Sequence, residues 1–214
     1  KLIFSSTAAV YGDPRETPIT EAHPTDPVNP YGRTKLMVET VLRDYDRAHG
    51  LRSVSLRYFN AAGADPEGET GECHDPETHL VPNLLLSLLG RKGRLKVFGD
   101  DFPTADGTAV RDYIHVTDLA AAHVLALKAL IAGGPSDVIN LGTEKGHSVL
   151  EVIQAAEKAT GRAVPYEVAP RRQGDVAVLL ASKERAERSL GWAPRLSGLE
   201  TIVKTAWDWH RKVR

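Results

Sequence analysis

The stretch FSSTAAVYG (Phe4–Gly12), followed along the chain by PYGRTK (Pro30–Lys35), decides how this sequence folds. The short apolar run Leu2–Phe4 ends in three hydroxyl side chains, Ser5–Thr7. Such a run is typical of a buried strand in a parallel sheet. Open α/β sheets bind their ligands at the carboxyl ends of the strands. We therefore predict that this strand carries alcohol groups to the ligand-binding edge of a parallel sheet.

The residues after this strand predict a helix and a second strand. A loop over 12–29 contains four prolines. The apolar spacing of the next segment predicts a helix from Tyr31 to His49, preceded by Pro30 and stopped by Gly50. Arg52–Phe59 then predicts a strand. A strand, a helix and a strand in this order form a βαβ unit, which implies a parallel sheet.

Beyond residue 60 the predicted elements are shorter and the loops longer. Asn60–Thr78 is predicted to be a long polar loop. The predicted helices are Leu80–Leu89, Asp118–Ile131 (capped by Thr117), a Ser148-capped helix ending at Thr160, Ser182–Leu190 and a Ser197-capped helix ending near Lys212; the predicted strands are Leu95–Phe98, Asp112–His115, Val138–Leu141 and Val164–Val168. The fold class is α/β, a doubly wound parallel sheet with a smaller α/β ligand-binding region attached to it.

Composition excludes several classes of partner. The 214 residues are 42% hydrophobic and carry a formal net charge of −1, so neither nucleic acid nor an anionic membrane is an expected partner. No apolar run reaches membrane-spanning length. The single cysteine, Cys73, cannot form an internal disulfide, which favours a reducing, cytoplasmic location.

Tyr31, Lys35 and Thr7 form a candidate catalytic group. Tyr31 and Lys35 are four residues apart, so they share one face of the predicted helix. A fixed cation nearby favours the phenolate form of a tyrosine, and a hydroxyl can bond to both the phenol and a substrate alcohol. Such a group would deprotonate an alcohol while hydride leaves its carbon. The alternative is an exposed pair on an amphipathic helix, because Y-x-x-x-K alone is a common pattern.

Four segments resemble the UDP-glucose 4-epimerases, members of the extended short-chain dehydrogenase/reductase family. These are FSSTAAVYGD, PYGRTKLMVE, LRYFNAAGA and DGTAVRDYIHVTDLAAAH, and the similarity covers essentially the whole chain. The resemblance implies a Rossmann-like fold. Residues 1–60 would be the C-terminal portion of the NAD-binding domain and residues 61–214 mainly the UDP-sugar-binding region, with about 113–142 returning to the Rossmann domain.

The resemblance also implies the reaction and its residues. Thr7 would be the catalytic hydroxyl, Tyr31 the base and Lys35 the activating lysine that also binds the nicotinamide ribose. Ser5 and Tyr58 would lie on the cofactor side. Tyr31 would take the proton of the sugar 4-hydroxyl as hydride passes to NAD, and the 4-keto sugar would rotate and be reduced on its other face.

A UDP-sugar carries a diphosphate, which favours arginine and amide donors. By resemblance, Arg111, Arg172 and Asn60 would contact the diphosphate, and His79 stands where relatives carry an asparagine that contacts sugar or phosphate. The alternatives are ordinary: Arg111 could pair with Asp112 or Asp118, and Arg172 could be one of two solvated arginines.

Three further residues follow from the same resemblance. Asp175 would bind the uridine ribose, and Phe98 would lie beside the uracil unless it is an ordinary core residue. Leu179 stands where a tyrosine restricts relatives to glucose and galactose. Because leucine is shorter, acceptance of N-acetylated UDP-sugars stays open.

A metal site is not expected. Cys73, His74 and His79 have the spacing C-H-x4-H, which lacks a matched second pair of ligands. The cysteine is interpreted as a lone loop thiol.

No G-x-x-G-x-x-G motif follows a predicted strand. We therefore expect that the phosphate-binding turn for NAD lies upstream, in an N-terminal portion not included here. The resemblance further implies a homodimer formed through the Tyr-Lys helix. Two other functions stay open: a related sugar-nucleotide dehydratase, decarboxylase or epimerase, and a non-catalytic NAD(P)-sensing protein. The residues Ala8 and Ala9 disfavour a dehydratase, which needs a carboxylate after the hydroxyl.

Overall fold

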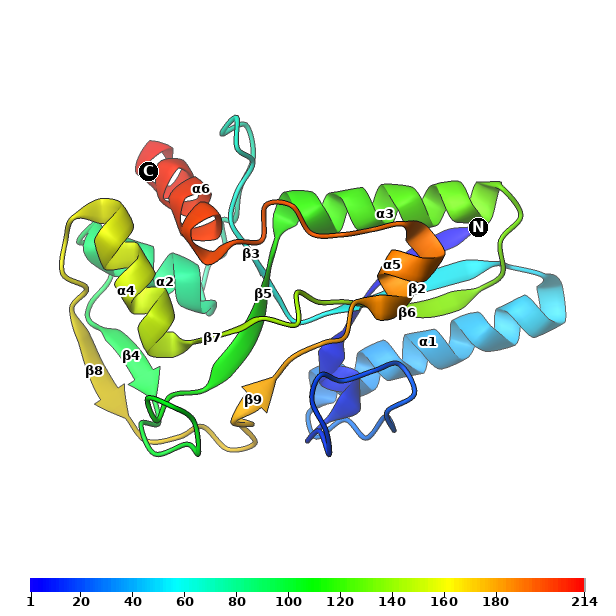
Figure 1. Cartoon of the computed structure of the whole chain (residues 1–214), viewed down its shortest axis with the longest axis horizontal. Coiled ribbons are helices and arrows are strands. Elements are labelled where there is room, and N and C mark those ends of the chain that lie inside the picture. The colour runs from blue at the N-terminus through cyan, green and yellow to red at the C-terminus, as the bar shows by residue number, and fades with distance from the viewer. Residues whose placement is uncertain (214) are drawn as a thin grey trace.

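Three parallel strands form the sheet predicted from the opening stretch. In this computed structural model, which describes residues 1–213, β1 (Leu2–Thr7), β2 (Ser53–Tyr58) and β6 (Asp137–Leu141) lie in the order β1-β2-β6 (Figure 1). Thr7 is in register with Tyr58, and Tyr58 with Leu141. The carboxyl ends of all three strands therefore meet at one edge.

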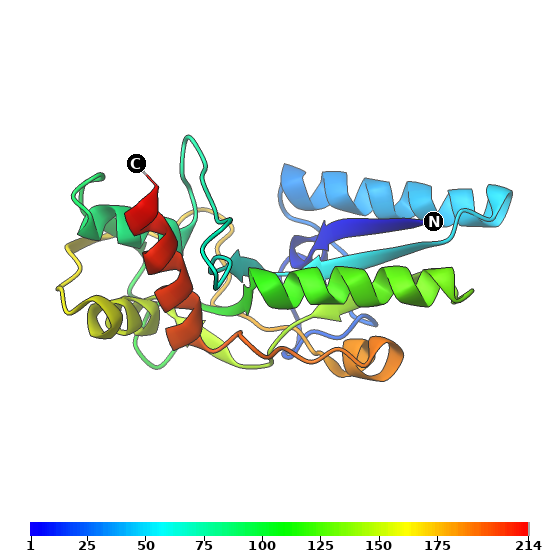
Figure 2. The same cartoon turned by 90° about the horizontal axis from the view of Figure 1, so that it is seen from above.

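Two long helices cover the two faces of this sheet. Figures 1 and 2 show α1 (Pro30–His49) on one face and α3 (Val116–Ile131) on the other. Asn29 caps α1 by accepting a bond from the Gly32 N–H, and Gly50 ends it in the left-handed region. The cap of α3 is His115, which accepts from the Thr117 N–H, so the prediction of Thr117 as the cap was wrong.

A buried ion pair fastens α1 to the sheet. Glu39 of α1 accepts bonds from Ser6 of β1 (2.5 Å) and from Nε of Arg57 of β2 (2.9 Å). The Tyr11 hydroxyl accepts from Arg57 (2.9 Å) and donates to Asn140 of β6 (2.7 Å). Tyr11 ends the short 3-10 helix η1 (Ala8–Tyr11). Side chains from one helix and all three strands are thereby joined.

The strand β5 (Val110–His115) is the centre of a second sheet. It pairs in parallel with β3 (Asn60–Ala62) and β9 (Val178–Leu179), and antiparallel with β7 (Gly146–Ser148). The interpretation of Asn60–Thr78 as loop throughout was therefore wrong for its first three residues. Strands of two or three residues are too short to show an alternating apolar pattern, which is why β7 and β9 were not predicted.

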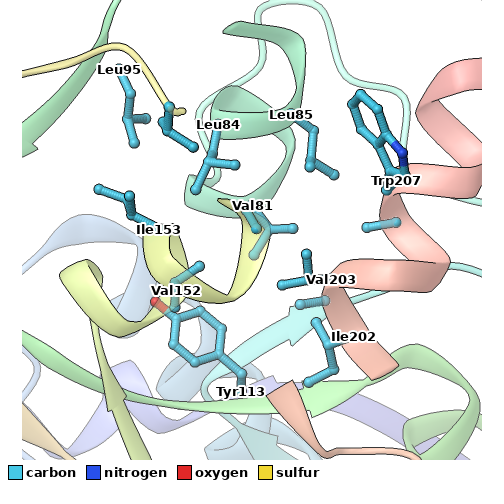
Figure 3. Packing of buried hydrophobic residues seen from close by; sticks show 14 of the residues in the cluster. Val81, Leu84, Leu85, Leu95, Tyr113, Val152, Ile153, Ile202, Val203 and Trp207 are labelled. Carbon is cyan, nitrogen blue, oxygen red and sulfur yellow. The ribbon is translucent and has the colours of Figure 1, made fainter. Parts of the chain in front are cut away.

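A second hydrophobic core lies beyond β5. The helices α2 (Leu80–Leu88), α4 (Val149–Thr160) and α6 (Leu199–Lys212) pack together next to the strand pair β4 (Leu95–Phe98) and β8 (Tyr166–Ala169). Figure 3 shows Leu84, Leu85, Val152, Ile202 and Trp207 meeting at the centre of this core. Fully burying each such side chain contributes about 1.5–3 kcal/mol to the free energy of folding.

The predicted N-terminal caps of α4 and α6 have different outcomes. The predicted capping of α4 by Ser148 is confirmed, with Glu151 completing a capping box. The predicted cap of α6 was wrong: α6 begins after Gly198, and the Ser197 hydroxyl instead donates to Asp118 of α3 at 2.6 Å.

Segments late in the chain pack back against the first sheet. The short helix α5 (Glu184–Leu190) packs beside β6, and Trp192 lies in the core between α3 and the first sheet. The division of the chain near residue 60 stays a prediction. None of the helices over residues 1–213 is long and apolar enough to cross a membrane.

Candidate functional site

Two adjoining cavities lie where the carboxyl ends of β1, β2 and β3 face α2 and β5. The larger has a volume of about 680 Å³ and the smaller about 190 Å³. Asn60, His79, Leu80 and Tyr113 line both cavities. The two spaces are therefore neighbouring parts of one site.

Thr7 and Tyr31 line the larger cavity. Thr7 is the last residue of β1, and its hydroxyl caps η1 by accepting from the Ala9 N–H at 3.1 Å. Tyr31 lies in the first turn of α1. That turn approaches η1 so closely that a Cβ on Gly32 would lie 2.5 Å from the Ala9 carbonyl oxygen. Glycine at this position thus lets the phenol and the hydroxyl share one cavity.

Lys35 lies behind Tyr31. Its ammonium donates to the Ser5 carbonyl at 2.9 Å and lies 5.6 Å from the centroid of the Tyr31 ring. One bond uses one of the three donors of an ammonium group, so two remain for a ligand hydroxyl or for the phenol. Thr7 and Tyr31 thus line one cavity, and Lys35, which lines neither cavity, lies beside the Tyr31 ring. Their catalytic roles stay a prediction.

Ser5 is turned away from this group. Its hydroxyl bonds to Nε2 of His123 at 2.9 Å, and only its carbonyl reaches Lys35. Ser5 lines neither cavity, whereas Tyr58 lines the larger one with its ring 6.4 Å from that of His123. The assignment of both residues to a cofactor stays a prediction.

Phe98, Arg111, Arg172 and Asp175 gather at the smaller cavity. Arg172 donates from Nε to Asp175 at 3.0 Å, and its guanidinium lies 4.8 Å from the centroid of the Phe98 ring. Arg111 approaches the other oxygen of Asp175 to 4.0 Å. Phe98 therefore lines the cavity and stacks on an arginine, and is not merely a core residue.

Asp175 is the ion-pair partner of Arg111 among residues 1–213. The two carboxylates considered from the sequence are occupied elsewhere, because Asp112 accepts bonds from Thr143 and Asp118 from Ser197. Burial lowers the pKa of Arg111, and Asp175 opposes this effect. Arginine stays charged at neutral pH in any case. The smaller cavity thus presents two guanidinium groups and one carboxylate, which leaves an excess of positive charge.

Asn60 and His79 lie between the two groups. Asn60 begins β3, where it pairs with Tyr113 of β5. His79 is the residue before α2, and its Nδ1 bonds to the carboxylate of Glu72. Both side chains are accessible from either cavity. Their position is the one expected for groups that contact the middle of a long ligand.

Leu179 does not line either cavity. It pairs with Arg111 in the second sheet and packs against the cluster that contains Tyr11 and Ile19. Its proposed influence on sugar size stays a prediction.

The sequence argument missed Tyr113, Lys96 and Glu72 as lining residues. Tyr113 belongs to the motif VRDYIHV, which was a usable signal; burial raises the pKa of its hydroxyl to about 12, with Arg111 opposing, so it remains protonated at neutral pH. Lys96 alternates with buried residues on β4, and Glu72 lies in an irregular loop. Neither pattern indicates a cavity.

Known proteins resemble this chain closely. It is 53% identical over 212 residues to the UDP-glucose 4-epimerase of Halalkalibacterium halodurans, covering 99% of this chain and 64% of that protein. The solved UDP-glucose 4-epimerase of Brucella ovis, in complex with NAD, is 51% identical with a TM-score of 0.94, over 96% of this chain and 63% of that one. The enzyme of Bifidobacterium longum, in complex with NAD+ and UDP, is 43% identical with a TM-score of 0.89, over 99% and 64%.

The chain thus spans slightly less than two thirds of the length of these relatives. Within the chain, residues 1–142 match the NAD dependent epimerase/dehydratase family. The matched region contains the hydroxyl, phenol and ammonium group, the strand β5 with Arg111, and all three strands of the first sheet up to Leu141. On this match the chain belongs to the NAD dependent epimerase/dehydratase family.

Proposed function

We propose that these residues form the proton-transfer and substrate-binding parts of a UDP-glucose 4-epimerase. One observation supports this more than any other: a hydroxyl-phenol pair lines one of two adjoining cavities, and an arginine-carboxylate group lines the other. Two proteins similar to this chain, from Halalkalibacterium halodurans and Brucella ovis, are UDP-glucose 4-epimerases. The sheet with α1 and α3 would serve the cofactor, and the region around the second core would serve the sugar nucleotide.

Tyr31 acts as the base in this proposal. Thr7 donates to or accepts from the sugar 4-hydroxyl and holds it beside the phenol, which takes the proton and later returns it. Lys35, fixed by the Ser5 carbonyl, stabilises the negative charge that develops on the phenolic oxygen. The free donors of Lys35 suit the ribose hydroxyls of NAD. When bound, NAD supplies the acceptor and donor of hydride at the sugar carbon.

The smaller cavity holds the nucleotide in this proposal. Arg111 and Arg172 bind the diphosphate, because planar guanidinium groups bond to phosphate oxygens in pairs. Asp175 keeps both arginines oriented and accepts a bond from the uridine ribose. Phe98 stacks beside the uracil, while Asn60 and His79 contact the diphosphate or the sugar. Leu179 would leave space for an N-acetylated sugar, which an assay with UDP-N-acetylglucosamine tests.

We also propose a homodimer and a cytosolic location. The outer face of α1 carries the exposed apolar residues Val38, Val41 and Tyr45 at helical spacing, which suits contact with a second copy. The free thiol of Cys73 is exposed, which suits a reducing compartment.

Replacing Tyr31 by Phe tests the proposed function. In a protein that contains this chain, Tyr31→Phe removes the proton acceptor and leaves the ring. We expect the turnover of UDP-galactose to fall by about 10²–10⁴-fold, with UDP binding unchanged. Tyr45→Phe on the same helix is the matched control and should retain full turnover. Equal turnover of the wild-type and Tyr31→Phe proteins would rule out Tyr31 as the base.

A further inference from the structure

The loop before α2 brings two histidines and two glutamates together, and we propose that it binds a divalent transition-metal ion such as Zn²⁺. The group consists of Glu72, His74, Glu77 and His79, each offering one donor atom within 4.8 Å of the others. This site goes beyond the proposed epimerase function and shares His79 with the proposed substrate contacts.

The loop holds its shape through contacts outside the group. Nε1 of Trp209 in α6 donates to the Glu72 carbonyl at 2.9 Å. Gly71 lies so close to the same indole that a Cβ there would be 2.4 Å from it. At the other end, Oε1 of Glu77 accepts from the N–H groups of Thr78 (2.7 Å) and His79 (2.8 Å). Both ends of the loop are therefore fixed, and the second oxygen of Glu77 remains for a ligand.

The donor atoms are spaced like ligands around one ion. Nδ1 of His74 is 3.0 Å from Oε1 of Glu72 and 3.6 Å from Oε2 of Glu77. Nδ1 of His79 is hydrogen-bonded to the carboxylate of Glu72. Zinc binds imidazole nitrogen and carboxylate oxygen at about 2.0–2.2 Å. Ligands around it in tetrahedral geometry are therefore about 3.4 Å apart, close to the observed spacing.

The charges of the group also require a cation. The side chain of Glu77 is 5% exposed and that of Glu72 is 17% exposed, yet neither forms an ion pair with a lysine or arginine among residues 1–213. Two carboxylates removed from water beside each other are costly unless positive charge accompanies them. A bound divalent ion supplies that charge.

The chemistry of the donors selects the class of metal. Imidazole nitrogen suits Zn²⁺, Ni²⁺ and Cu²⁺, whereas Mg²⁺ and Ca²⁺ prefer oxygen alone. The sequence argument against a metal considered only Cys73, His74 and His79, because carboxylates five residues apart in an irregular loop give no periodic signal. Cys73 is exposed and is not among the converging donors.

The site lies in the wall of the larger cavity, which Glu72, His74 and His79 line. His79 also lines the smaller cavity. An ion bound here would therefore be coordinated by His79, the histidine that lines both cavities.

Titration of the chain with zinc tests this site. We expect calorimetry at pH 7.5 to show one equivalent of Zn²⁺ bound, and Co²⁺ to give the visible absorption of a site with nitrogen and oxygen ligands. Glu72→Gln and His74→Gln should each weaken binding at least tenfold, with folding confirmed by circular dichroism. Cys73→Ser and His49→Gln, which change an exposed thiol and an exposed histidine outside the group, should bind as the wild type does.

Three results would overturn the proposal. The first is the absence of a stoichiometric site in the wild-type chain. The second is equal affinity in the wild type, Glu72→Gln and His74→Gln, which indicates adventitious binding elsewhere. The third is loss of binding in Cys73→Ser, which would assign the metal to the loop thiol.

Discussion

Glu39 and Arg57 support the proposed catalytic group although they line neither cavity of the candidate site. Glu39 lies four residues after Lys35 on α1 and is 3% exposed. Its bonds to Ser6 and Arg57 fix the rotation of α1 about its own axis and its position along the sheet. The position of Tyr31, at the start of the same helix, depends on that register. The ion pair is therefore part of the support on which the proposed base rests.

Removal of Glu39 should destabilise the protein strongly. Glu39→Ala leaves the Arg57 guanidinium buried without its partner, which costs about 3–5 kcal/mol in the free energy of unfolding. Urea denaturation followed by circular dichroism measures this loss. Glu39→Gln keeps one oxygen that can accept from Ser6 and from Nε of Arg57, and it should lose less. Equal stability of the Ala and Gln variants would show that the pair does not hold α1 in place.

Arg171 and Arg172 are neighbours with different expected roles. Arg172 faces the smaller cavity, whereas Arg171 bonds to Asp101 and stacks on Phe102. Losing a hydrogen bond to a charged group costs about 1.5–3 kcal/mol. Arg172→Ala should therefore weaken the binding of UDP about 10–100-fold by calorimetry. Arg171→Ala should bind UDP almost as the wild type does, and a similar loss in both variants would contradict the assignment.

At the scale of single elements, the cap of α3 introduces a dependence on pH. Nδ1 of the buried His115 accepts from the Thr117 N–H at 3.1 Å, and Nε2 donates to Thr205 at 3.0 Å. Protonation of Nδ1 would abolish the first bond. Burial lowers the pKa of His115 below its usual range near 6.5, and Asp118 and Asp65 only partly oppose this. The helix cap is therefore formed by a neutral histidine.

The lowered pKa of folded His115 fixes the direction in which the free energy of unfolding changes with pH. The unfolded chain binds the proton of His115 more readily than the folded chain does. The contribution of neutral His115 to the free energy of unfolding is therefore complete above about pH 6.5 and is lost as the pH falls through the lower pKa of the folded state. We expect the free energy of unfolding to decrease between pH 7.5 and 5.5. His115→Asn keeps a capping side chain without an imidazole and should reduce the slope with pH. His49→Asn, at the exposed end of α1, should leave the slope unchanged.

Sequence patterns predicted the long elements and failed for the short ones. The helix beginning near Tyr31, the β1 and β2 strands and the Ser148 cap have local signals. For the helix these are the spacing of apolar residues, a proline at its start and a glycine at its end. Ser197 carries an equally good capping signal, but its hydroxyl bonds to Asp118 instead. Tertiary contacts decided that case. A pattern in one segment cannot show a partner 79 residues away.

The candidate site was predictable to the extent that motifs mark it. Thr7, Tyr31 and Lys35 come together because a strand end and a helix start carry them. Arg111, Arg172 and Asp175 were named from resemblance, but the pairing of Asp175 with both arginines was visible only in the structure. The orientation of Ser5 towards His123 could not be foreseen, because α3 supplies that histidine from 118 residues further along the chain.

At the scale of the whole molecule, exposed apolar residues on α1 predict association. Val38, Val41 and Tyr45 are between 39% and 52% exposed and follow one face of the helix. In a protein that contains this chain, Val41→Asp places a charge in the proposed interface. We expect sedimentation to show a change from dimer to monomer.

Val168→Asp is the matched control for this change. Val168 is equally exposed but lies on β8, far from α1 in Figure 1. The control variant should remain a dimer. A dimer that survives Val41→Asp would place the interface on another surface.

The strand β5 connects the linings of the two cavities. Arg111, which lines the smaller cavity, lies near the start of β5, where β9 pairs with β5. Asn60 of β3, which lines both cavities, pairs with Tyr113 further along β5. Backbone hydrogen bonds therefore set the distance between Arg111 and Asn60. In the proposed function, a free hexose would occupy the larger cavity alone, and a nucleoside diphosphate without its sugar would occupy only the smaller one. The two halves of a sugar nucleotide would then be recognised together.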